Sequence, residues 1–176
     1  APWISFGSDR ILFRPDEEAK VQFKIQVVEN RNAFVVVYAG KLDEAKGGMF
    51  LADMFWEKFP AGREIVGVVV GNTSGEYGQG VEKRFSESRN RIFRYPTQKY
   101  EALPYIFQIA DLVVFPRQCS LSFYDAQACA VPVLSEDNHI NVDRCRHQNG
   151  GNFAAGDVED FRRKIVEFSR LPEGEY

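Results

Sequence analysis

The sequence has few of the residues on which metal and disulfide sites depend. Among its 176 residues are only two histidines and three cysteines. Cys119, Cys129 and Cys145 are odd in number and lack CxxC spacing, so neither a disulfide framework nor a zinc site is supported. His139 and His147 have no acid or cysteine at metal-ligand spacing and are expected at the surface. We therefore expect no metal ion and a reducing cytoplasm as the setting, with Cys129 as a small core residue.

Other common signals are missing as well. No apolar run approaches the ~20 residues of a membrane span, and residues 1–9 lack the basic flank and long apolar region of a signal peptide. The net charge of −3 argues against a broad nucleic-acid surface. A GxSxG nucleophile turn and a Walker A loop are both absent from the sequence. These absences argue against a transmembrane protein, a general nucleic-acid binder, a GxSxG hydrolase and a P-loop protein.

The chain does contain enough apolar sequence for one α/β domain. Hydrophobic residues make up 44% and aromatic residues 14% of the chain, which excludes disorder. Short apolar runs rich in β-branched residues predict strands that are buried on both faces of a parallel sheet. These runs are Phe34–Ala39, Ile65–Val70, Ile92–Tyr95, Leu112–Phe115 and Val131–Leu134, with 150–154 as a short last strand.

Helices are expected between these strands, at Glu17–Glu29, Gly47–Phe59, Val81–Ser88, Gln98–Ile109, Phe123–Ala130 and Asp157–Ser169. Pro104 falls about two turns into the fourth of these, so either a later start or a bend is expected there. We expect residues 2–15 to form an ordered lead-in and residues 72–80, with their glycines, to form a loop. Strands that alternate with helices predict a Rossmann-like, doubly wound parallel sheet with helices on both faces. Ligands of such sheets bind outside the carboxyl ends of the strands. The strand-end loops to consider are therefore 40–48, 71–80, 95–98, 116–122 and 135–139.

The segment Asp111–Ser135 suggests a nucleotide site. A strand, a short loop and the start of a helix bring Cys119 and Ser120 to a strand end, and Asp125 follows on the first turn of the helix. Free backbone N–H groups and the helix dipole favour an anion there, and a nearby acid can hold a ribose hydroxyl pair. The alternative is that Ser120 or Ser122 caps the helix and the dipole alone favours Asp125.

Two further strand-end loops are candidates. In Gly40–Gly48, both Lys41 and Lys46 can reach the crevice at the strand ends, where two ammonium groups suit a diphosphate. The alternative is that these lysines are solvated loop charges, although a cation at a helix start is mildly unfavourable without a bound anion. In Gly71–Gly75, glycines permit close backbone approach to a ligand, but a plain surface loop is the favoured interpretation.

Seven blocks of the chain, in order, resemble the motifs of one family. They are Ile4–Pro15 (P-N-G-V-D…F-x-P), Phe34–Gly48 (V-G-R-L-x-x-x-K-G), Ile65–Gly71 (l-x-i-v-G), Ile92–Pro96 (v-x-f-x-G), Tyr105–Pro116 (Y-x-x-A-D-l-x-v-x-P), Asp125–Leu134 (E-A-m-A-C-G-x-P-V-i) and Asn149–Asp157 (n-G-x-l-v-x-x-G-D). Together they resemble the C-terminal, donor-binding half of a GT-B glycosyltransferase of the group 1 type. That family transfers sugars from nucleotide donors with retention.

The resemblance implies roles for individual residues. Lys41 and Lys46 take the places of the family's diphosphate-binding Arg and Lys, and Asp125 takes the place of the Glu that binds the ribose hydroxyls. The loop residues that would meet the diphosphate through their amides are Cys119, Ser120 and Leu121. The base would be bordered by Gly71, Asn72, Arg94, Tyr95 and Pro96. The resemblance assigns no catalytic residue.

The chain also departs from the family's pattern. The usual E-x7-E motif has its first Glu in the loop before the helix, whereas Arg117 stands eight residues before Asp125 and no acid lies between Phe115 and Asp125. The loop is about three residues shorter than usual and resembles a P-G-x-H-S variant with Cys119 in the place of His. Ala130 replaces the usual Gly. These changes concern the chemistry at the sugar more than nucleotide binding.

The resemblance implies that residues 1–176 are a single nucleotide-sugar-binding domain excised from a longer, two-domain hexosyltransferase of polysaccharide biosynthesis. Its substrate would be a nucleotide-diphosphate sugar, with no metal or other cofactor and no nucleic acid as a partner. The missing N-terminal domain would hold a glycan or lipid-linked acceptor. The full enzyme would be cytoplasmic, with peripheral association at the inner face of a membrane, and this domain alone would be inactive.

Two other functions stay open at this point. A non-catalytic nucleotide-binding or scaffold domain derived from a glycosyltransferase would explain the missing first acid. A receiver-type signalling domain is also doubly wound, but it needs a phosphoacceptor Asp at the end of a central strand. In this chain Gly40, Gly71 and Pro116 follow the predicted strands instead.

Overall fold

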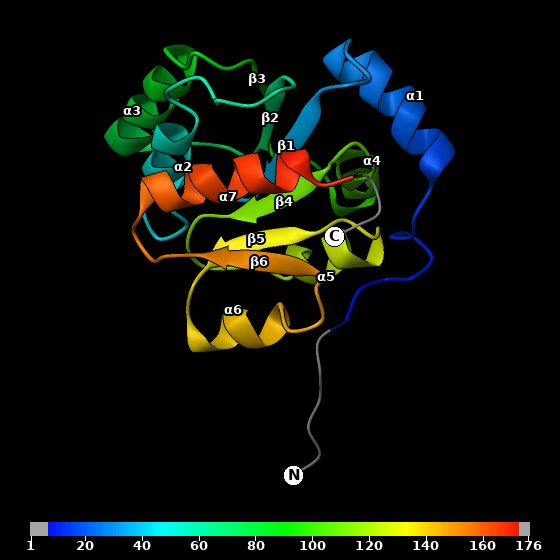
Figure 1. The fold of residues 1–176 in the computed structure, drawn as a ribbon. Helices are drawn as coiled ribbons and strands as arrows, with labels where there is room; N and C mark the ends of the chain where they lie inside the picture. The colour runs from blue at the N-terminus through cyan, green and yellow to red at the C-terminus, as the bar shows by residue number, and fades with distance from the viewer. Residues whose placement is uncertain (1–6, 173–176) are drawn as a thin grey trace.

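The computed structural model describes residues 7–172 and shows one six-stranded parallel sheet (Figure 1). The strands are β1 (Phe34–Ala39), β2 (Ile65–Val70), β3 (Ile92–Tyr95), β4 (Leu112–Phe115), β5 (Val133–Glu136) and β6 (Gly150–Phe153). Their order across the sheet is β3-β2-β1-β4-β5-β6. The chain therefore builds one half outward from β1, returns to the centre, and builds the other half outward from β4. This arrangement confirms the predicted Rossmann-like, doubly wound fold.

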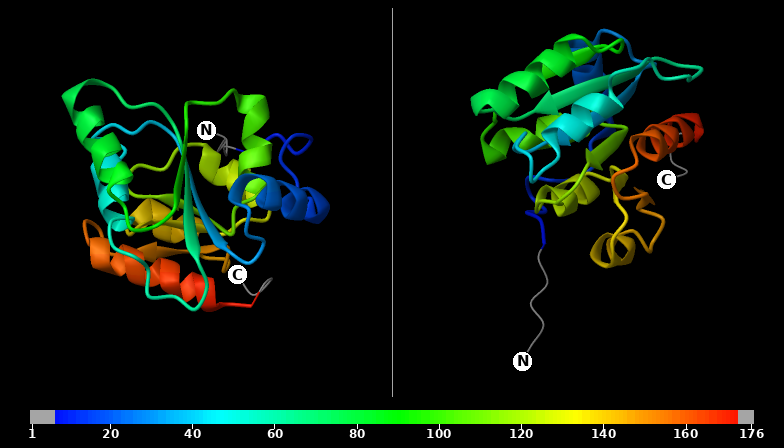
Figure 2. Two further views of the ribbon diagram at one scale, coloured as in Figure 1. Left: turned by 90° about the horizontal axis from the view of Figure 1, so that it is seen from above. Right: turned by 90° about the vertical axis from the view of Figure 1, so that its left-hand side faces the viewer.

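Helices cover both faces of the sheet (Figure 2). One face is covered by α2 (Gly48–Met54), α3 (Gly75–Ser86) and α7 (Val158–Arg170). The other is covered by α1 (Glu17–Val28), α4 (Leu103–Gln108) and α5 (Ser122–Ala128). The remaining helical segments are the 3-10 turn η1 (Tyr100–Ala102) and α6 (His139–Arg144). Among residues 7–172, no helix is long and apolar enough to cross a membrane.

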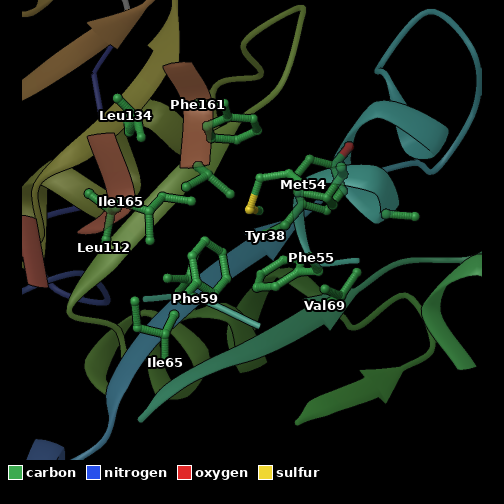
Figure 3. Close-up of a cluster of buried hydrophobic side chains, with 14 of the residues drawn as sticks. Tyr38, Met54, Phe55, Phe59, Ile65, Val69, Leu112, Leu134, Phe161 and Ile165 are labelled. Carbon is green, nitrogen blue, oxygen red and sulfur yellow. The ribbon is translucent and has the colours of Figure 1, made fainter. Parts of the chain in front are cut away.

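Strands β1 and β2 are buried along their whole length, as their continuous apolar sequences predict. Alternate residues point to opposite faces, so Phe34, Val36 and Tyr38 join one core and Val35 and Val37 join the other. Figure 3 shows the first of these cores, with side chains from α2, α7 and four strands meeting between the layers. Cys129 belongs to the second core and is buried, as predicted.

The strands agree closely with the sequence, and the largest shift is at β5, which begins two residues later than predicted. Ala130 adopts a left-handed backbone conformation, and the Val131 amide donates to the carbonyl of Ala126 in α5. Val131 and Pro132 therefore close the end of the helix, and sheet pairing starts only at Val133.

The prediction of a glycine-containing loop at residues 72–80 is wrong, because α3 already begins at Gly75. The glycines let this helix lie close to its surroundings. A Cβ atom at Gly78 would come 2.8 Å from the side chain of Thr73, and one at Gly80 would come 3.3 Å from Met49. Here glycine serves close packing, a role that composition alone does not distinguish from loop flexibility.

Of the other helices, α2 is shorter than predicted, α4 begins later than residue 98, and α6 was not predicted. Helix α2 ends at Met54 because the side chains of Ser88 and Asn90 take the Phe55 carbonyl that a continuing helix would use. Helix α4 begins at Leu103 with Pro104 in its first turn, where proline is tolerated. Helix α6 was not predicted at all. The Asn138 side chain caps α6 by accepting hydrogen bonds from the amides of residues 140 and 141.

Candidate functional site

The loops that follow β1 and β4 meet at the carboxyl edge of the sheet, where its strand order reverses. Lys46 Nζ donates a hydrogen bond to the carbonyl of Gln118 over 3.4 Å, and Arg117 Nη1 donates to the carbonyl of Glu44 over 3.1 Å. Gly47 has a φ of +75°, and a Cβ atom there would come 3.0 Å from Arg117 Cγ. The two loops thus form one surface.

The two candidate lysines stand differently in this surface. Lys46 is half-buried, and its amide donates to the Asp43 carboxylate over 2.9 Å, which fixes the turn that carries it. Lys41 is exposed, and its carbonyl accepts a hydrogen bond from the Tyr38 hydroxyl. The ammonium group of Lys41 makes no ion pair or hydrogen bond within residues 7–172. One lysine is therefore held against the β4 loop, and the other is free in solvent nearby.

The β4 loop presents a polar atom without a partner. Ser120 Oγ is shielded from solvent and has no hydrogen-bond partner in the described chain. The Ser120 carbonyl accepts from the amide of Phe123, and Leu121 lies at the start of α5 with 56% of its surface exposed. In the described part of the chain no side chain caps this helix, so the sequence alternative of a Ser120 or Ser122 cap is not realised.

Cys119 is anchored on the other side of the loop. Its Sγ lies 3.3 Å from Asn141 Oδ1, and Asn141 in turn donates to the carbonyl of Glu136 at the end of β5. Burial raises the pKa of the Cys119 thiol to about 11, although Arg144 opposes this rise. The thiol is therefore protonated near neutral pH, which suits a structural role and not a nucleophile. The unpredicted helix α6 supports the loop through this contact.

Asp125, the candidate ribose acid, is buried and already has partners. It is 4% exposed, and one carboxylate oxygen accepts a 2.6 Å hydrogen bond from Ser8 Oγ and a 3.4 Å contact from the Tyr100 hydroxyl. The Tyr100 ring packs edge-on against Phe13. Burial raises the pKa of Tyr100, and the Asp125 charge adds to this effect. The lead-in segment thus covers Asp125. Among residues 7–172, no hydrogen bond or ion pair joins Asp125 to Lys41 or Lys46.

The five residues that were predicted to border the base all lie in the wall of one cavity. This cavity has a volume of about 330 Å³ and opens at the carboxyl ends of β2 and β3. The full lining is Gly71, Asn72, Thr73, Glu82, Arg94, Tyr95 and Pro96. Gly71 has a φ of +152°, and a Cβ atom there would come 1.8 Å from the Gly40 carbonyl, so no other residue fits. Asn72 is fixed by paired hydrogen bonds with Thr97, of 3.1 and 2.9 Å.

The Arg94 side chain in this cavity is fully engaged. It pairs with Glu82 at 2.7 Å and donates to the carbonyls of Val69 and Gly71. The hydrogen bond from Arg94 lowers the pKa of Glu82 despite partial burial. Arg94 therefore shapes the cavity wall and positions the Gly71 carbonyl.

Sequence reasoning missed four residues of this region. Glu82 and Thr73 complete the cavity wall, and Ser8 and Tyr100 cover Asp125. Their partners lie nine to 117 residues away in the chain, and no local pattern marks them. The two histidines are exposed, as predicted. Within the described chain no group of three or more His, Cys, Asp or Glu side chains could hold a metal ion.

Solved structures share this fold at low sequence identity. HepE from Anabaena, solved in complex with UDP and glucose, matches with a TM-score of 0.75 and 19% identity over 92% of this chain and 45% of HepE. Sucrose-phosphate synthase from Thermosynechococcus elongatus matches at 0.70 and 19% identity over 95% and 44%. A glycosyltransferase from Rickettsia africae matches at 0.74 and 14% identity over 94% and 46%. The chain spans less than half the length of each of these proteins.

Sequence comparison adds the family. A search of curated proteins gave no match. A sequence profile described as "Glycosyl transferases group 1" matches residues 33–170, which include all six strands and the loops of the candidate site. The expected family resemblance is therefore confirmed, and the chain belongs to the group 1 glycosyl transferases.

Proposed function

We propose that this chain is the donor-binding domain of a glycosyltransferase and binds a nucleotide-diphosphate sugar at the carboxyl edge of its sheet. The observation that carries the proposal is the joining of the β1 and β4 loops around Lys46 and Ser120, beside the cavity of Gly71 and Arg94. HepE, which shares this fold, has been solved with UDP and with UDP-glucose, and this supports the same ligand class.

The layout of the edge suits a nucleoside diphosphate. The cavity lies at the ends of β2 and β3, and the joined loops lie at the ends of β1 and β4. Neighbouring strands are ~4.8 Å apart, so about 10 Å separates the two places, a distance that a nucleoside diphosphate spans. We assign the base to the cavity and the diphosphate to Lys46, Lys41 and the amides of residues 119–121.

If Asp125 binds the ribose, the ribose must replace one of the hydrogen-bond partners that Asp125 has in the free chain. Ser8 and Tyr100 both offer hydroxyl donors to the carboxylate, and a ribose diol offers the same kind of donor. A bound nucleotide would therefore replace Ser8 on Asp125 without leaving the buried carboxylate unsatisfied. The lead-in segment would move aside in this step.

The chemistry proposed for the site is electrostatic. Negative charge develops on the departing nucleoside diphosphate, and fixed ammonium and amide groups beside it stabilise that charge. The chain spans 45% of HepE, so we propose that an N-terminal domain of a longer protein holds a glycan or lipid-linked acceptor. Proximity between the two bound substrates would supply the rest of the acceleration. In this scheme residues 1–176 bind donor but transfer no hexosyl group alone.

The finer parts of the proposal concern the full-length enzyme. We place it in the cytoplasm, peripherally associated with the inner face of a membrane, in polysaccharide biosynthesis. It would need no metal ion and no nucleic acid. The sugar and the base are left open, because the cavity walls are formed mainly by backbone and by side chains already engaged with each other.

A non-catalytic nucleotide-binding or scaffold domain is the second candidate. Two observations favour it: the loop before α5 has no acid, and the buried carboxylate of Asp125 is satisfied by Ser8 and Tyr100. In this case the domain would keep the fold and a nucleotide site without contributing to transfer.

Calorimetry with UDP, GDP, ADP and UDP-glucose tests donor binding directly. The proposal expects weak but saturable binding of at least one nucleotide to residues 1–176. An absence of heat at millimolar concentration of every nucleotide would contradict both candidates. In the full-length protein, the double variant Lys41→Ala, Asp125→Ala separates them: loss of glycan synthesis supports the donor site, whereas normal synthesis supports the scaffold.

A further inference from the structure

A larger cavity, of about 640 Å³, opens at the opposite edge of the sheet. Two segments form it, the one that leads into β2 and the one that leads into β3. The lining residues are Lys58, Phe59, Ala61, Gly62, Arg63, Glu64, Ile65, Arg89, Asn90 and Arg91. Because all strands are parallel, the amino ends of β2 and β3 lie a full strand length from the donor site at the carboxyl edge. The proposed function does not use this cavity.

The cavity carries an excess of positive charge. Four of its lining residues are cationic and only Glu64 is acidic. Arg91 pairs with Glu64 at 3.2 Å, and Arg89 pairs with Glu57 at 2.9 Å just outside the cavity. Within residues 7–172 the side chains of Lys58 and Arg63 form no ion pair. Two positive charges are therefore left without a counter-charge beside one cavity.

Arg63 is the more unusual of the two. Its Nε and Nη2 atoms are shielded from solvent and have no hydrogen-bond partner in the described chain. The guanidinium carbon lies 4.8 Å from the centre of the Phe34 ring, so a cation–π contact holds the group at the cavity. Buried N–H donors are rarely left unsatisfied, because desolvation without a new bond is costly. An anion in the cavity would give them acceptors after a small rotation of the side chain.

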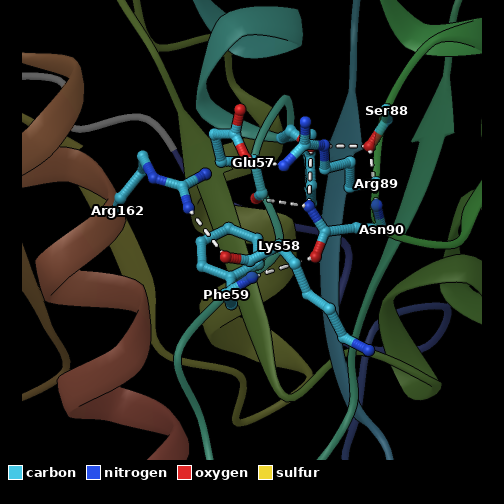
Figure 4. Close-up of polar contacts among 8 residues, drawn as sticks. Glu57, Lys58, Phe59, Ser88, Arg89, Asn90 and Arg162 are labelled. Carbon is cyan, nitrogen blue, oxygen red and sulfur yellow. Dashed lines mark hydrogen bonds and ion pairs between the residues drawn. The ribbon is translucent and has the colours of Figure 1, made fainter.

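The cavity walls are fixed before any ligand binds (Figure 4). Asn90 donates to the carbonyls of Phe55 and Glu57 and accepts from the amide of Phe59, which ties the two lining segments together. On the outer side, Arg162 donates to the Lys58 carbonyl over 3.2 Å and stacks over the Phe59 ring. A ligand would therefore meet lining segments whose backbone is already held in place, so binding would cost little free energy of loop ordering.

We propose that this cavity is a second anion-binding site, specific for a phosphate-bearing ligand and independent of the donor site. Two uncompensated cations match the two charges of a phosphate monoester, whereas a carboxylate would leave one cation unbalanced. The planar fork of Arg63 can bind two phosphate oxygens at once. The polar walls formed by Asn90 and the ion pairs suit a hydrophilic ligand.

An NMR titration of the chain with inorganic phosphate tests the proposal. Saturable shifts are expected at the amides of residues 58, 59, 61–65 and 89–91 and at the Arg63 Nε–H group. Lys58→Gln, at an exposed position, and Arg63→Gln should each weaken this response about tenfold, the effect of losing one charge-assisted contact. Arg146→Gln removes an exposed, ion-paired arginine elsewhere and should change nothing. An unaltered response in both Lys58→Gln and Arg63→Gln would overturn the proposal.

Two further experiments identify the source of the phosphate and test whether the second site is independent of the donor site. Co-sedimentation with vesicles that contain phosphatidic acid, lost in Lys58→Gln, would identify a lipid headgroup, whereas a response to phosphate alone supports a soluble ligand. No response to either overturns the proposal. Phosphate shifts at residues 58–65 should persist in Lys46→Ala and in the presence of UDP. If they disappear in both, the second site is not independent and the proposal fails.

Discussion

Lys46 Nζ donates a hydrogen bond to the backbone carbonyl of Gln118, 3.4 Å away, across the point where the sheet reverses its strand order. This contact joins two loops that lie 72 residues apart in the chain. It holds a cation next to the unpartnered Ser120 hydroxyl and the start of α5. The candidate diphosphate site therefore depends on tertiary contact between loops that are each ambiguous alone.

Replacement of Lys46 by Ala should weaken UDP binding about tenfold, since one charge-assisted contact of roughly 1.5 kcal/mol is lost. The stability of the fold should change by less than about 0.5 kcal/mol, because the side chain is only half-buried and makes one long hydrogen bond. Calorimetry and urea denaturation give the two values. Lys83→Ala, at an exposed position on α3, is the matched control and should leave UDP affinity unchanged.

Replacement of Ser8 by Ala should strengthen UDP binding several-fold. In the free chain Ser8 donates a 2.6 Å hydrogen bond to Asp125, and the ribose must replace this bond. Without Ser8 there is no such bond to break, so the free energy of UDP binding becomes more favourable. Calorimetry of Ser8→Ala beside the unaltered chain measures the difference. Equal affinity in the two proteins would show that Asp125 has a purely structural role and that the ribose binds elsewhere.

Replacement of Ala130 by Gly should stabilise the fold by about 1 kcal/mol, because Ala130 has a φ of +58°, a conformation that costs L-residues ~1–2 kcal/mol and glycine almost nothing. Urea denaturation monitored by circular dichroism measures the change. Ala128→Gly, at the last residue of α5, is the control and should destabilise by up to ~1 kcal/mol. A loss of stability in Ala130→Gly would contradict the strain assigned to this position.

The Cys119 thiol should react slowly with iodoacetamide at neutral and mildly alkaline pH. Burial raises its pKa to about 11, so at pH 8 the thiolate fraction is on the order of 100-fold below that of an unfolded cysteine. The rate should rise with pH until the thiol ionises near pH 11, since only the thiolate reacts. Peptide mass spectrometry after timed labelling provides the rates. Fast labelling of the folded chain at pH 8 would place Cys119 in an accessible, ionised state.

Much of the fold could be predicted, because continuous apolar runs mark the strands in the sequence. β1 and β2 are continuous apolar runs closed by glycine, and their predicted bounds agree with the structure. Helix α6 gave no such signal, because Ile140 and Val142 are exposed and its cap is a single Asn138. Helix α3 was missed at its start because Gly78 looks the same in a loop and in a close helix contact.

The candidate site was predictable in its residue types but not in its contacts. The resemblance to the group 1 family grouped Gly71 with Arg94, which do line one cavity. Nothing in the local sequence indicated that Arg94 would be held by Glu82, or that Ser8 would reach Asp125 from 117 residues away. Such side-chain partners follow from how the layers pack, which a local pattern does not specify.

The most direct test of the account is a map of amide shifts in residues 1–176 during a titration with UDP. Binding at the carboxyl edge predicts saturable shifts in the loops 41–48, 71–73, 94–97 and 117–121. The amides at the amino edge, of residues 58, 59, 61–65 and 89–91, should stay unchanged. Shifts confined to the amino edge, or no shifts at millimolar UDP, would contradict the claim that this domain binds its nucleotide where β1 and β4 end.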